Sequence, residues 1–118
     1  MRFMFMIYRD EKQLEALPKA ERQRLIDASL AYDEELRQSG HYIVSDALEP
    51  SRTARILRAR RGKVLTTDGP FAETKEMLGG FFLIEAKNLE EACEIASRFP
   101  APPGGAVEVR QVRERIHS

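Results

Sequence analysis

A chain of 118 residues fits one domain, and a domain of this size buries roughly 65% of its unfolded surface, so its core needs no disulfide or metal. Nineteen basic side chains balance nineteen acidic ones without a long block of one sign, which argues against nucleic acid and anionic membranes as partners. No stretch approaches the roughly 20 apolar residues of a membrane span, and the N-terminal apolar run is too short for a signal peptide, so we expect one cytoplasmic domain over residues 1–118.

The first predicted elements are a central strand and a long helix. Phe3 to Tyr8 is apolar at every position, which is typical of a strand covered on both faces. Pro18 at a first helical position predicts a helix to about Ser39, which Gly40 then ends. The apolar stripe of this helix consists of Leu25, Ala28, Tyr32 and Leu36. Asp33 and Arg37 lie four residues apart, and we expect this pair on the solvated side.

The middle of the chain predicts a strand and then a hairpin. His41 to Leu48 reads as a strand, and the segment around Pro50 reads as a loop because proline cannot donate to a sheet ladder. Thr53 to Arg60 and Lys63 to Thr67 follow as two strands, joined by a tight turn at Arg61-Gly62.

The last third predicts a strand, a helix and a strand. Phe81 to Ala86 is apolar except for Glu85, and Asn88 with Glu91 forms a capping pair for a helix that ends near Phe99. Cys93 is expected on the packed face of this helix, as a structural thiol. The prolines and glycines of residues 100–105 forbid continuation of the helix, and alternation from Val107 to Arg110 predicts the final strand.

This order of elements, β-α-β, a hairpin, then β-α-β, predicts an α+β sandwich of ferredoxin-like type with an inserted β-hairpin. Two helices cover only one face of such a sheet. Because the first strand is apolar on both sides, the other face needs a cover, and a second copy of the same sheet is the simplest one. We therefore expect a two-fold homodimer in which the two sheets face each other.

The most distinctive stretch of the chain is "TTDGPFAETKEMLGGFF", residues 66–82. Its nine-residue run "DGPFAETKE" at residues 68–76, followed by "LGGF", resembles the signature of the DGPFAETKE family of YCII-related proteins. The resemblance also includes the opening "FMFMIY", the helix end "EELRQSG", the hairpin return "GKVLTTDGPF" and the closing "GGAVEVRQV". It therefore extends over nearly the whole chain.

The resemblance implies a dimeric α+β barrel in a bacterial protein. Some YCII-like proteins carry a pair of His and Asp in a cleft, with the histidine on the first helix. This chain has no histidine between Lys12 and Gly40, and Ala28 stands about where that histidine is expected, so the pair does not carry over. Genes of the family often lie beside sigma factors of the extracytoplasmic-function type, which implies a regulatory role as the alternative to an enzyme.

Asp68 is the candidate catalytic residue, with two readings left open. In the first, its carboxylate accepts hydrogen bonds from backbone N–H groups of the turn and is purely structural. In the second, it lies in a cleft under Phe71 and acts as a general base or orients a water. The neighbouring Glu73, Lys75 and Glu76 read either as a solvated turn or as charged groups of the same site.

Gly79 and Gly80 are candidate ligand-binding positions. Glycine ahead of a strand costs backbone entropy and often marks the close approach of another backbone or of a ligand. We therefore expect residues 68–80 to form a lid or wall over the sheet, anchored by Phe71. Such a lid would border either a small pocket or the dimer interface.

His41 completes the candidate ligand-binding residues, although a surface role is its commoner one. It lies far from His117, and with a single cysteine no cluster has metal-ligand spacing, so we expect no metal site. The chain has no glycine-rich phosphate loop, and we expect no cofactor.

The hairpin is locally basic, with Arg52, Arg55, Arg58, Arg60, Arg61 and Lys63. These side chains fall on both faces of the hairpin, so we expect a solvated hairpin rather than a surface for nucleic acid. An anionic metabolite or an acidic patch of a partner remains as an alternative.

Two functions remain open from the sequence. The first is a small-molecule binder or hydrolase-like enzyme that uses Asp68 in a pocket beside the signature. The second is a non-catalytic regulatory module, linked to a sigma factor, in which the same segment stabilises the dimer or docks a protein partner. The missing helix histidine favours the second function, and the paired glycines beside charged residues favour the first.

Overall fold

The computed structural model describes residues 1–115. None of the helices in this range is both long and apolar enough to cross a membrane. In chain order the elements are β1 (Arg2–Arg9), α1 (Glu11–Ala16), α2 (Lys19–Gln38), β2 (Tyr42–Ala47), a 3-10 turn η1 (Ser51–Thr53), β3 (Arg55–Arg60), β4 (Lys63–Asp68), β5 (Met77–Glu85), α3 (Leu89–Ser97) and β6 (Ala106–Gln111).

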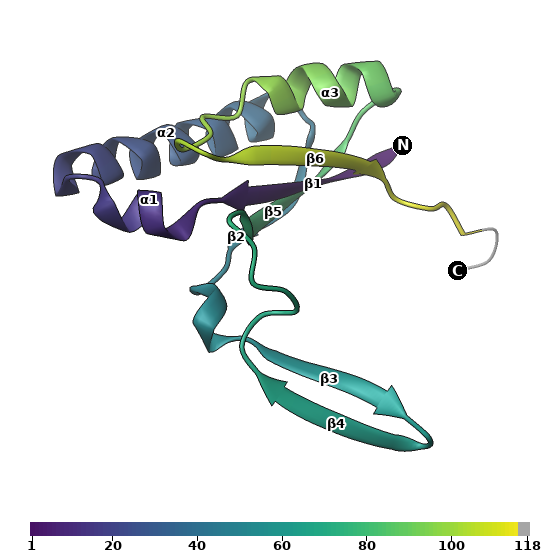
Figure 1. Cartoon of the computed structure of the whole chain (residues 1–118). Coiled ribbons are helices and arrows are strands. Elements are labelled where there is room, and N and C mark those ends of the chain that lie inside the picture. The colour runs from purple at the N-terminus through teal and green to yellow at the C-terminus, as the bar shows by residue number, and fades with distance from the viewer. Residues whose placement is uncertain (116–118) are drawn as a thin grey trace.

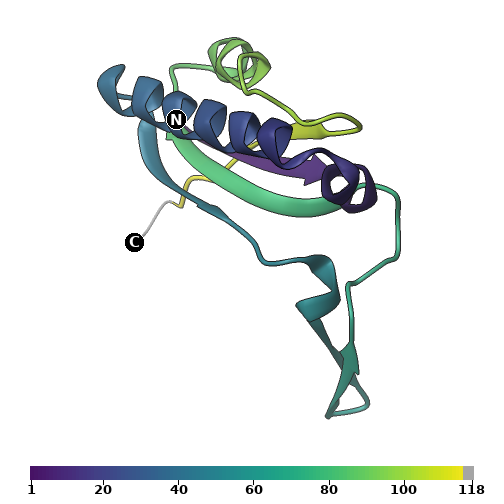
Figure 2. The ribbon, with the colours of Figure 1, turned by 90° about the vertical axis from the view of Figure 1, so that its left-hand side faces the viewer.

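The main sheet has four strands in the order β2-β5-β1-β6, and every neighbouring pair is antiparallel. Helices α2 and α3 lie together on one side of this sheet, as Figures 1 and 2 show. The predicted ferredoxin-like α+β sandwich is therefore confirmed, and β1 lies centrally as expected. This is the unit from which dimeric α+β barrels are built. We call the sheet with its three helices the body.

The core of the body lies between the sheet and the helices. Alternate residues of β1 point toward the helices, and the largest fully buried side chains are Phe3, Phe5, Leu36, Ile84 and Ile95. Three aromatic rings pack edge to face at the centre, those of Tyr32, Phe82 and Phe99, with centroids 5.4 to 5.6 Å apart. The Tyr32 hydroxyl also donates to the Ile95 carbonyl at 2.6 Å, which ties α2 to α3.

The sheet face opposite the helices, here called the open face, is also apolar. Met4 pairs with Leu83 across the β1–β5 ladder, and Met6 pairs with Phe81. All four side chains are only partly buried, and Val44 on β2 continues the same face with 39% of its surface exposed. The two-sided apolar character predicted for the central strands is thus present.

The hairpin forms as predicted, but as a separate two-stranded sheet of β3 and β4. We call residues 55–68 the arm. Figure 2 shows the arm extending from the end of the body, on the side opposite the helices. Hydrogen bonds hold its root: the Gly69 N–H donates to the Ala54 carbonyl at 2.8 Å, and both the N–H and the hydroxyl of Ser51 donate to the Glu11 carboxylate.

Several local predictions need correction. Helix α1 was not predicted, and it forms because the Asp10 side chain caps it by accepting from Gln13 N–H. Strand β5 begins at Met77 rather than Phe81, so the two glycines lie inside the strand. Cys93 is exposed, because the packed face of α3 consists of Ala92, Ile95 and Ala96.

Candidate functional site

A cavity of about 480 Å³ lies between α2 and the sheet, here called the α2 cavity. Its walls are mostly apolar and come from α2, β1, β5 and the segment after α3; they include Ile7, Leu25, Ile26, Leu30, Phe82 and Phe99. Ile26 and Leu30 are 54% and 61% exposed, although they lie on the cavity side of the helix. The first half of α2 therefore does not close onto the sheet.

The cavity exists because small residues form its floor. Gly79 and Gly80 on β5 and Ala47 on β2 line it beneath α2. Gly79 lies where the β1–β5 register shifts, between the partners of Ile7 and Tyr8. A Cβ on Gly80 would lie 3.0 Å from the Asp46 carbonyl oxygen, so a side chain there would push β2 away from β5.

One end of the cavity carries a chain of polar groups. Asp33 projects from α2 toward Ser45 on β2, and the Ser45 hydroxyl lies 3.4 and 3.5 Å from the two Asp33 oxygens. The Tyr42 hydroxyl lies 2.9 Å from the same Ser45 oxygen. The Arg37 guanidinium stacks 4.0 Å above the Tyr42 ring, which holds that ring in place.

Burial raises the pKa of Asp33 above its ordinary value, and the Ser45 hydroxyl and the Arg37 charge oppose this rise only in part. A carboxyl group with a raised pKa exchanges its proton at a pH closer to neutrality, which suits a general acid or base. Asp33 therefore has the location and the environment of a group that can move a proton.

The cavity is also lined by two arginines, Arg9 and Arg22. The Arg9 guanidinium donates from Nη2 to the Leu48 carbonyl at 3.0 Å, while its buried Nε has no partner within the described residues. A Cβ on Gly79 would collide with this Nε, so a side chain at position 79 would have to displace the Arg9 side chain. These cations provide positive charge for an anionic substituent of a ligand.

The signature segment does not form the predicted lid. Asp68 ends β4 on the arm, its side chain is 87% exposed, and it pairs with Arg55 Nε at 3.1 Å. Phe71 is 72% exposed and contacts the Arg58 guanidinium, 4.9 Å from its ring centroid, so it anchors nothing to the sheet. Within one chain, Asp68 lies neither under Phe71 nor among the residues that line the α2 cavity.

The other predicted site residues are dispersed. Gly79 and Gly80 are buried and line the α2 cavity. Lys75 borders a second hollow of about 450 Å³ near Tyr8, and Glu73 is exposed. His41 precedes β2, and its Nδ1 lies 2.8 Å from the Glu85 carbonyl.

No group of three or more His, Cys, Asp or Glu side chains is arranged to hold a metal ion in residues 1–115, and His117 lies outside this range.

The polar end of the cavity was missed by sequence reasoning, which expected Asp33 on the solvated side. One signal was available, because Leu25, Ser29 and Asp33 recur every fourth residue and so share a helix face with the start of the apolar stripe. Two polar residues on such a face indicate a lining role. Ser45 had no comparable signal.

Comparison with known proteins agrees with this fold. The chain resembles the structure of 5-chloro-2-hydroxyhydroquinone dehydrochlorinase (TftG) from Burkholderia phenoliruptrix AC1100 in complex with 2,5-dihydroxybenzoquinone, with a TM-score of 0.51 and 20% identity, over 99% of this chain and 98% of that one. It is 35% identical over 112 residues to "Uncharacterized protein R00369" of Rhizobium meliloti (strain 1021), covering 93% of this chain and 90% of the relative. The YCII-related domain model matches residues 1–116, and the chain therefore belongs to the YCII-related family.

Proposed function

We propose that this protein is a small-molecule enzyme that binds a mostly apolar organic compound in the α2 cavity and uses Asp33 to transfer a proton. The observation that carries the proposal is the cavity itself, with a hydrogen-bonded carboxyl group at one end and apolar walls elsewhere. A concave, largely apolar site with a few converging polar groups is the usual form of a ligand pocket.

The volume and lining indicate the class of ligand. A space of about 480 Å³ lies within the usual range of roughly 300 to 1,000 Å³ for small-molecule pockets. The rings of Phe82 and Phe99 and the aliphatic side chains of α2 favour a planar or alicyclic carbon skeleton. Arg9 and Arg22 favour an anionic or strongly polarised substituent on that skeleton.

The chemistry follows from the polar end. Asp33 would take a proton from a hydroxyl or an acidic C–H of the ligand and return it later in the reaction. Ser45 and Tyr42 would keep the carboxyl group oriented through their hydrogen bonds.

The structural neighbour supports the choice of ligand class. TftG is named as a dehydrochlorinase, and its structure holds a dihydroxybenzoquinone, which is a small planar ring with ionisable hydroxyls. The same compound is therefore a rational first probe for this chain. The aromatic rings and the two arginines that line the α2 cavity suit a planar ring with ionisable hydroxyls.

We propose further that the working unit is a homodimer joined through the open faces. The partly buried Met4, Met6, Phe81 and Leu83 form a contiguous apolar surface on the central strands. A second copy of this surface would remove the remaining exposure, because a two-fold axis brings the same patch of both chains together.

The test compares two carboxylates in a thermal-shift titration. Wild type, Asp33→Asn and Asp68→Asn would be titrated with 2,5-dihydroxybenzoquinone and a panel of substituted phenols and benzoates. A ligand at about 100 times its dissociation constant raises the wild-type Tm by roughly 10 °C. We expect Asp68→Asn to keep this response and Asp33→Asn to weaken it.

The outcomes separate the alternatives. If Asp68→Asn loses the response and Asp33→Asn keeps it, the active carboxylate is on the arm and the proposal is wrong. If no compound of this class shifts the wild-type Tm, the small-molecule proposal fails and the regulatory alternative gains.

A further inference from the structure

The Arg9 side chain in the wall of the α2 cavity has hydrogen-bonding capacity that the chain itself does not use. Within the described residues its guanidinium bonds only through Nη2, to the Leu48 carbonyl at 3.0 Å. Nε is buried without a partner, whereas Nη1 is not buried and bonds to no described residue either. A guanidinium carries five N–H donors, and a buried donor without an acceptor is costly. Arg9 therefore lacks an acceptor that a ligand can supply.

The backbone around Gly79 determines where this guanidinium lies. Arg9 ends β1 and, by alternation, shares the face of Phe5 and Ile7 that points toward the helices. Its side chain passes over Gly79, where a Cβ would lie 2.7 Å from the Arg9 Cδ. The Gly79 carbonyl accepts from the Leu48 N–H at 2.9 Å, and the Leu48 carbonyl accepts from Arg9. The guanidinium is thus held beside the floor of the cavity, next to the end of β2.

No carboxylate of the described chain neutralises this charge through an ion pair. None of the ion pairs within residues 1–115 includes Arg9. Glu11 is near enough for the Arg9 charge to contribute to its lowered pKa. The two oxygens of Glu11, however, accept from the N–H and the hydroxyl of Ser51. The charge of Arg9 is therefore available to an anion that enters the cavity.

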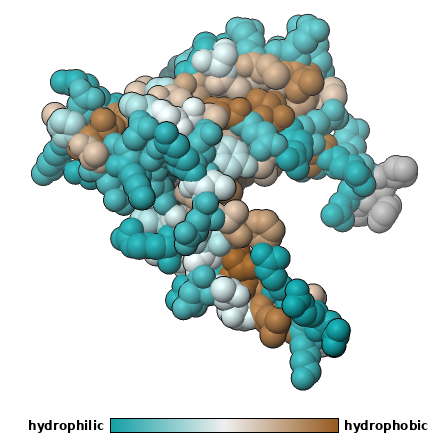
Figure 3. Space-filling model, in the orientation of Figure 1, coloured by the Kyte–Doolittle hydropathy of each residue, from teal (hydrophilic) through white to brown (hydrophobic). Residues whose placement is uncertain are grey.

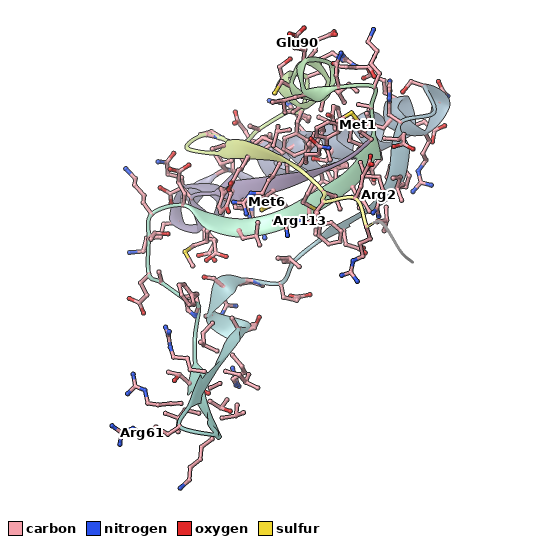
Figure 4. The ribbon with its side chains drawn as sticks, turned by 90° about the vertical axis from the view of Figure 1, so that its right-hand side faces the viewer. Met1, Arg2, Met6, Arg61, Glu90 and Arg113 are labelled. Carbon is pink, nitrogen blue, oxygen red and sulfur yellow. The ribbon has the colours of Figure 1, made fainter. Side chains whose placement is uncertain are left out.

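Other cations are less suited to hold that anion. Arg22 also lines the cavity, but it is exposed on α2, where water weakens an ion pair. The basic residues of the arm lie elsewhere. Figure 4 shows Arg61 at the tip of the arm, far from the main sheet and with its side chain directed outward, and Figure 3 shows hydrophilic side chains at that end of the arm. Arg9 is the cation with both the position and the free donors.

The separation of Arg9 from Asp33 indicates the shape of the ligand. Asp33 meets Ser45 on β2, and Arg9 meets Leu48, three residues further along the chain. Extended backbone advances about 3.3 Å per residue, so the two anchors lie roughly 10 Å apart. One six-membered ring reaches both anchors when its polar groups are at opposite ends. Polar groups on neighbouring ring atoms would reach only one of them.

We propose that Arg9 is the anion-binding residue of the α2 cavity, and that the ligand is a monocyclic aromatic acid with its carboxylate on Arg9 and a hydroxyl on Asp33. The inference rests on the proposed function and adds to it the substituent pattern of the ligand. The carboxylate accepts from the guanidinium N–H groups that the chain leaves free, in a charge-assisted contact. The ring then lies among apolar walls that include Phe82 and Phe99.

A matched pair of ligands tests the charge in wild type. The two compounds, para-hydroxybenzoate and para-hydroxybenzamide, share the ring and the hydroxyl but differ in the charge of the second group. Isothermal titration calorimetry at neutral pH measures both dissociation constants. We expect the acid to bind at least about tenfold more tightly, because hydrogen bonds to charged groups are the stronger ones. The ortho isomer of the acid tests the spacing and should bind more weakly than the para isomer.

Variants assign the preference for the acid to one residue. In Arg9→Gln the preference over the amide should fall to about twofold or less, with the affinity for the amide little changed. Arg22→Gln should lower the preference by about threefold or less, because Arg22 is exposed. Arg58→Gln, on the arm, is the matched control and should keep the preference. If Arg9→Gln does not fold, Gly79→Ala should reduce the preference as well, because its Cβ displaces the Arg9 side chain.

Three results would overturn this inference and leave the proposed function intact. The first is equal affinity of wild type for the acid and the amide. The second is a preference for the acid that persists in both Arg9→Gln and Gly79→Ala. The third is an ortho isomer that binds as tightly as the para isomer. If wild type binds none of these compounds and does not bind 2,5-dihydroxybenzoquinone, the proposed function fails and this inference fails with it.

Discussion

The body and the arm are built from similar residues but reach opposite states of burial. In the body, Phe3, Phe5 and Ile84 are fully buried between the sheet and the helices. In the arm, Leu57 and Val64 leave more than 60% of their surface in contact with solvent. A strand becomes part of a core only when another layer covers it, and within a single chain only the body has such a layer.

The difference explains where a site can form. The α2 cavity needs rigid walls, and the body supplies them through β1, β5 and the aromatic cluster of Tyr32, Phe82 and Phe99. The arm has exposed strands on both faces and offers no enclosed space within one chain. Its exposed residues are available for contact with another molecule.

The largest predicted effect contrasts one apolar residue from each region. Phe5→Ala removes a fully buried ring from the core and should lower the free energy of unfolding by about 3 to 5 kcal/mol. Leu57→Ala should change it by about 0.5 kcal/mol or less under conditions in which the chain is monomeric. Urea unfolding at low protein concentration measures both, and equal losses would mean that the arm belongs to the same cooperative core.

A smaller effect tests the floor of the cavity. Gly80→Ala would place a Cβ 3.0 Å from the Asp46 carbonyl oxygen, so β2 must move, at a cost of about 1 to 3 kcal/mol. The same change should weaken ligand binding in the α2 cavity. Gly62→Ala, at the tip of the arm, is a control for the effect on ligand binding. It is no control for stability, because the φ of 76° at Gly62 makes alanine strained at that position. Unchanged binding in Gly80→Ala would place the ligand elsewhere.

The smallest effects concern pH, and they have opposite signs at two carboxyl groups. Because the pKa of Asp33 is raised on folding, its contribution favours the folded state below its ordinary value of 3.8 and is lost as pH rises through the raised pKa. The free energy of unfolding of Asp33→Asn should therefore increase relative to that of wild type as pH rises through the raised pKa of Asp33. The gain should be small, because the carboxyl group is only partly buried.

Glu11 provides the opposite case at the root of the arm. Burial alone would raise its pKa, but the two hydrogen bonds from Ser51 and the charges of Arg9 and Arg52 together lower the pKa below the ordinary value of 4.5. The stabilisation from Glu11 is therefore present above that value and lost as pH falls through the lowered pKa. Because Glu11→Gln lacks this stabilisation at every pH, its Tm should fall less between neutral and acidic pH than the Tm of wild type. The same pH dependence of the Tm in both proteins would show that Glu11 does not contribute.

Much of the body could be predicted from local patterns. The apolar β1 and the helix end at Gly40 follow from residues adjacent in sequence, and so does the hairpin turn at Arg61-Gly62 in the arm. The Asn88 cap is also confirmed, since its side chain accepts from Glu91 N–H at 2.9 Å. These features depend on residues close in sequence, which is why the sequence alone reveals them.

The site and the placement of the arm depend on distant residues. Asp33 meets Ser45 only because β2 lies beneath α2, and no local pattern encodes that pairing. The hairpin leaves the main sheet because residues 48–54 and 69–76 lead it away from β2 and β5. The composition of residues 68–76 indicated a segment with a special role. The spacing of its residues could not show where this segment lies relative to the sheet.

The most direct test of the central claim is amide hydrogen exchange of wild type with and without saturating 2,5-dihydroxybenzoquinone. Amides of α2 and β5 along the α2 cavity should gain protection when the compound is added, whereas amides of β3 and β4 should exchange at the same rate with and without it. Protection gained only in the arm, or in no part of the chain, would contradict the claim that a ligand binds in the α2 cavity.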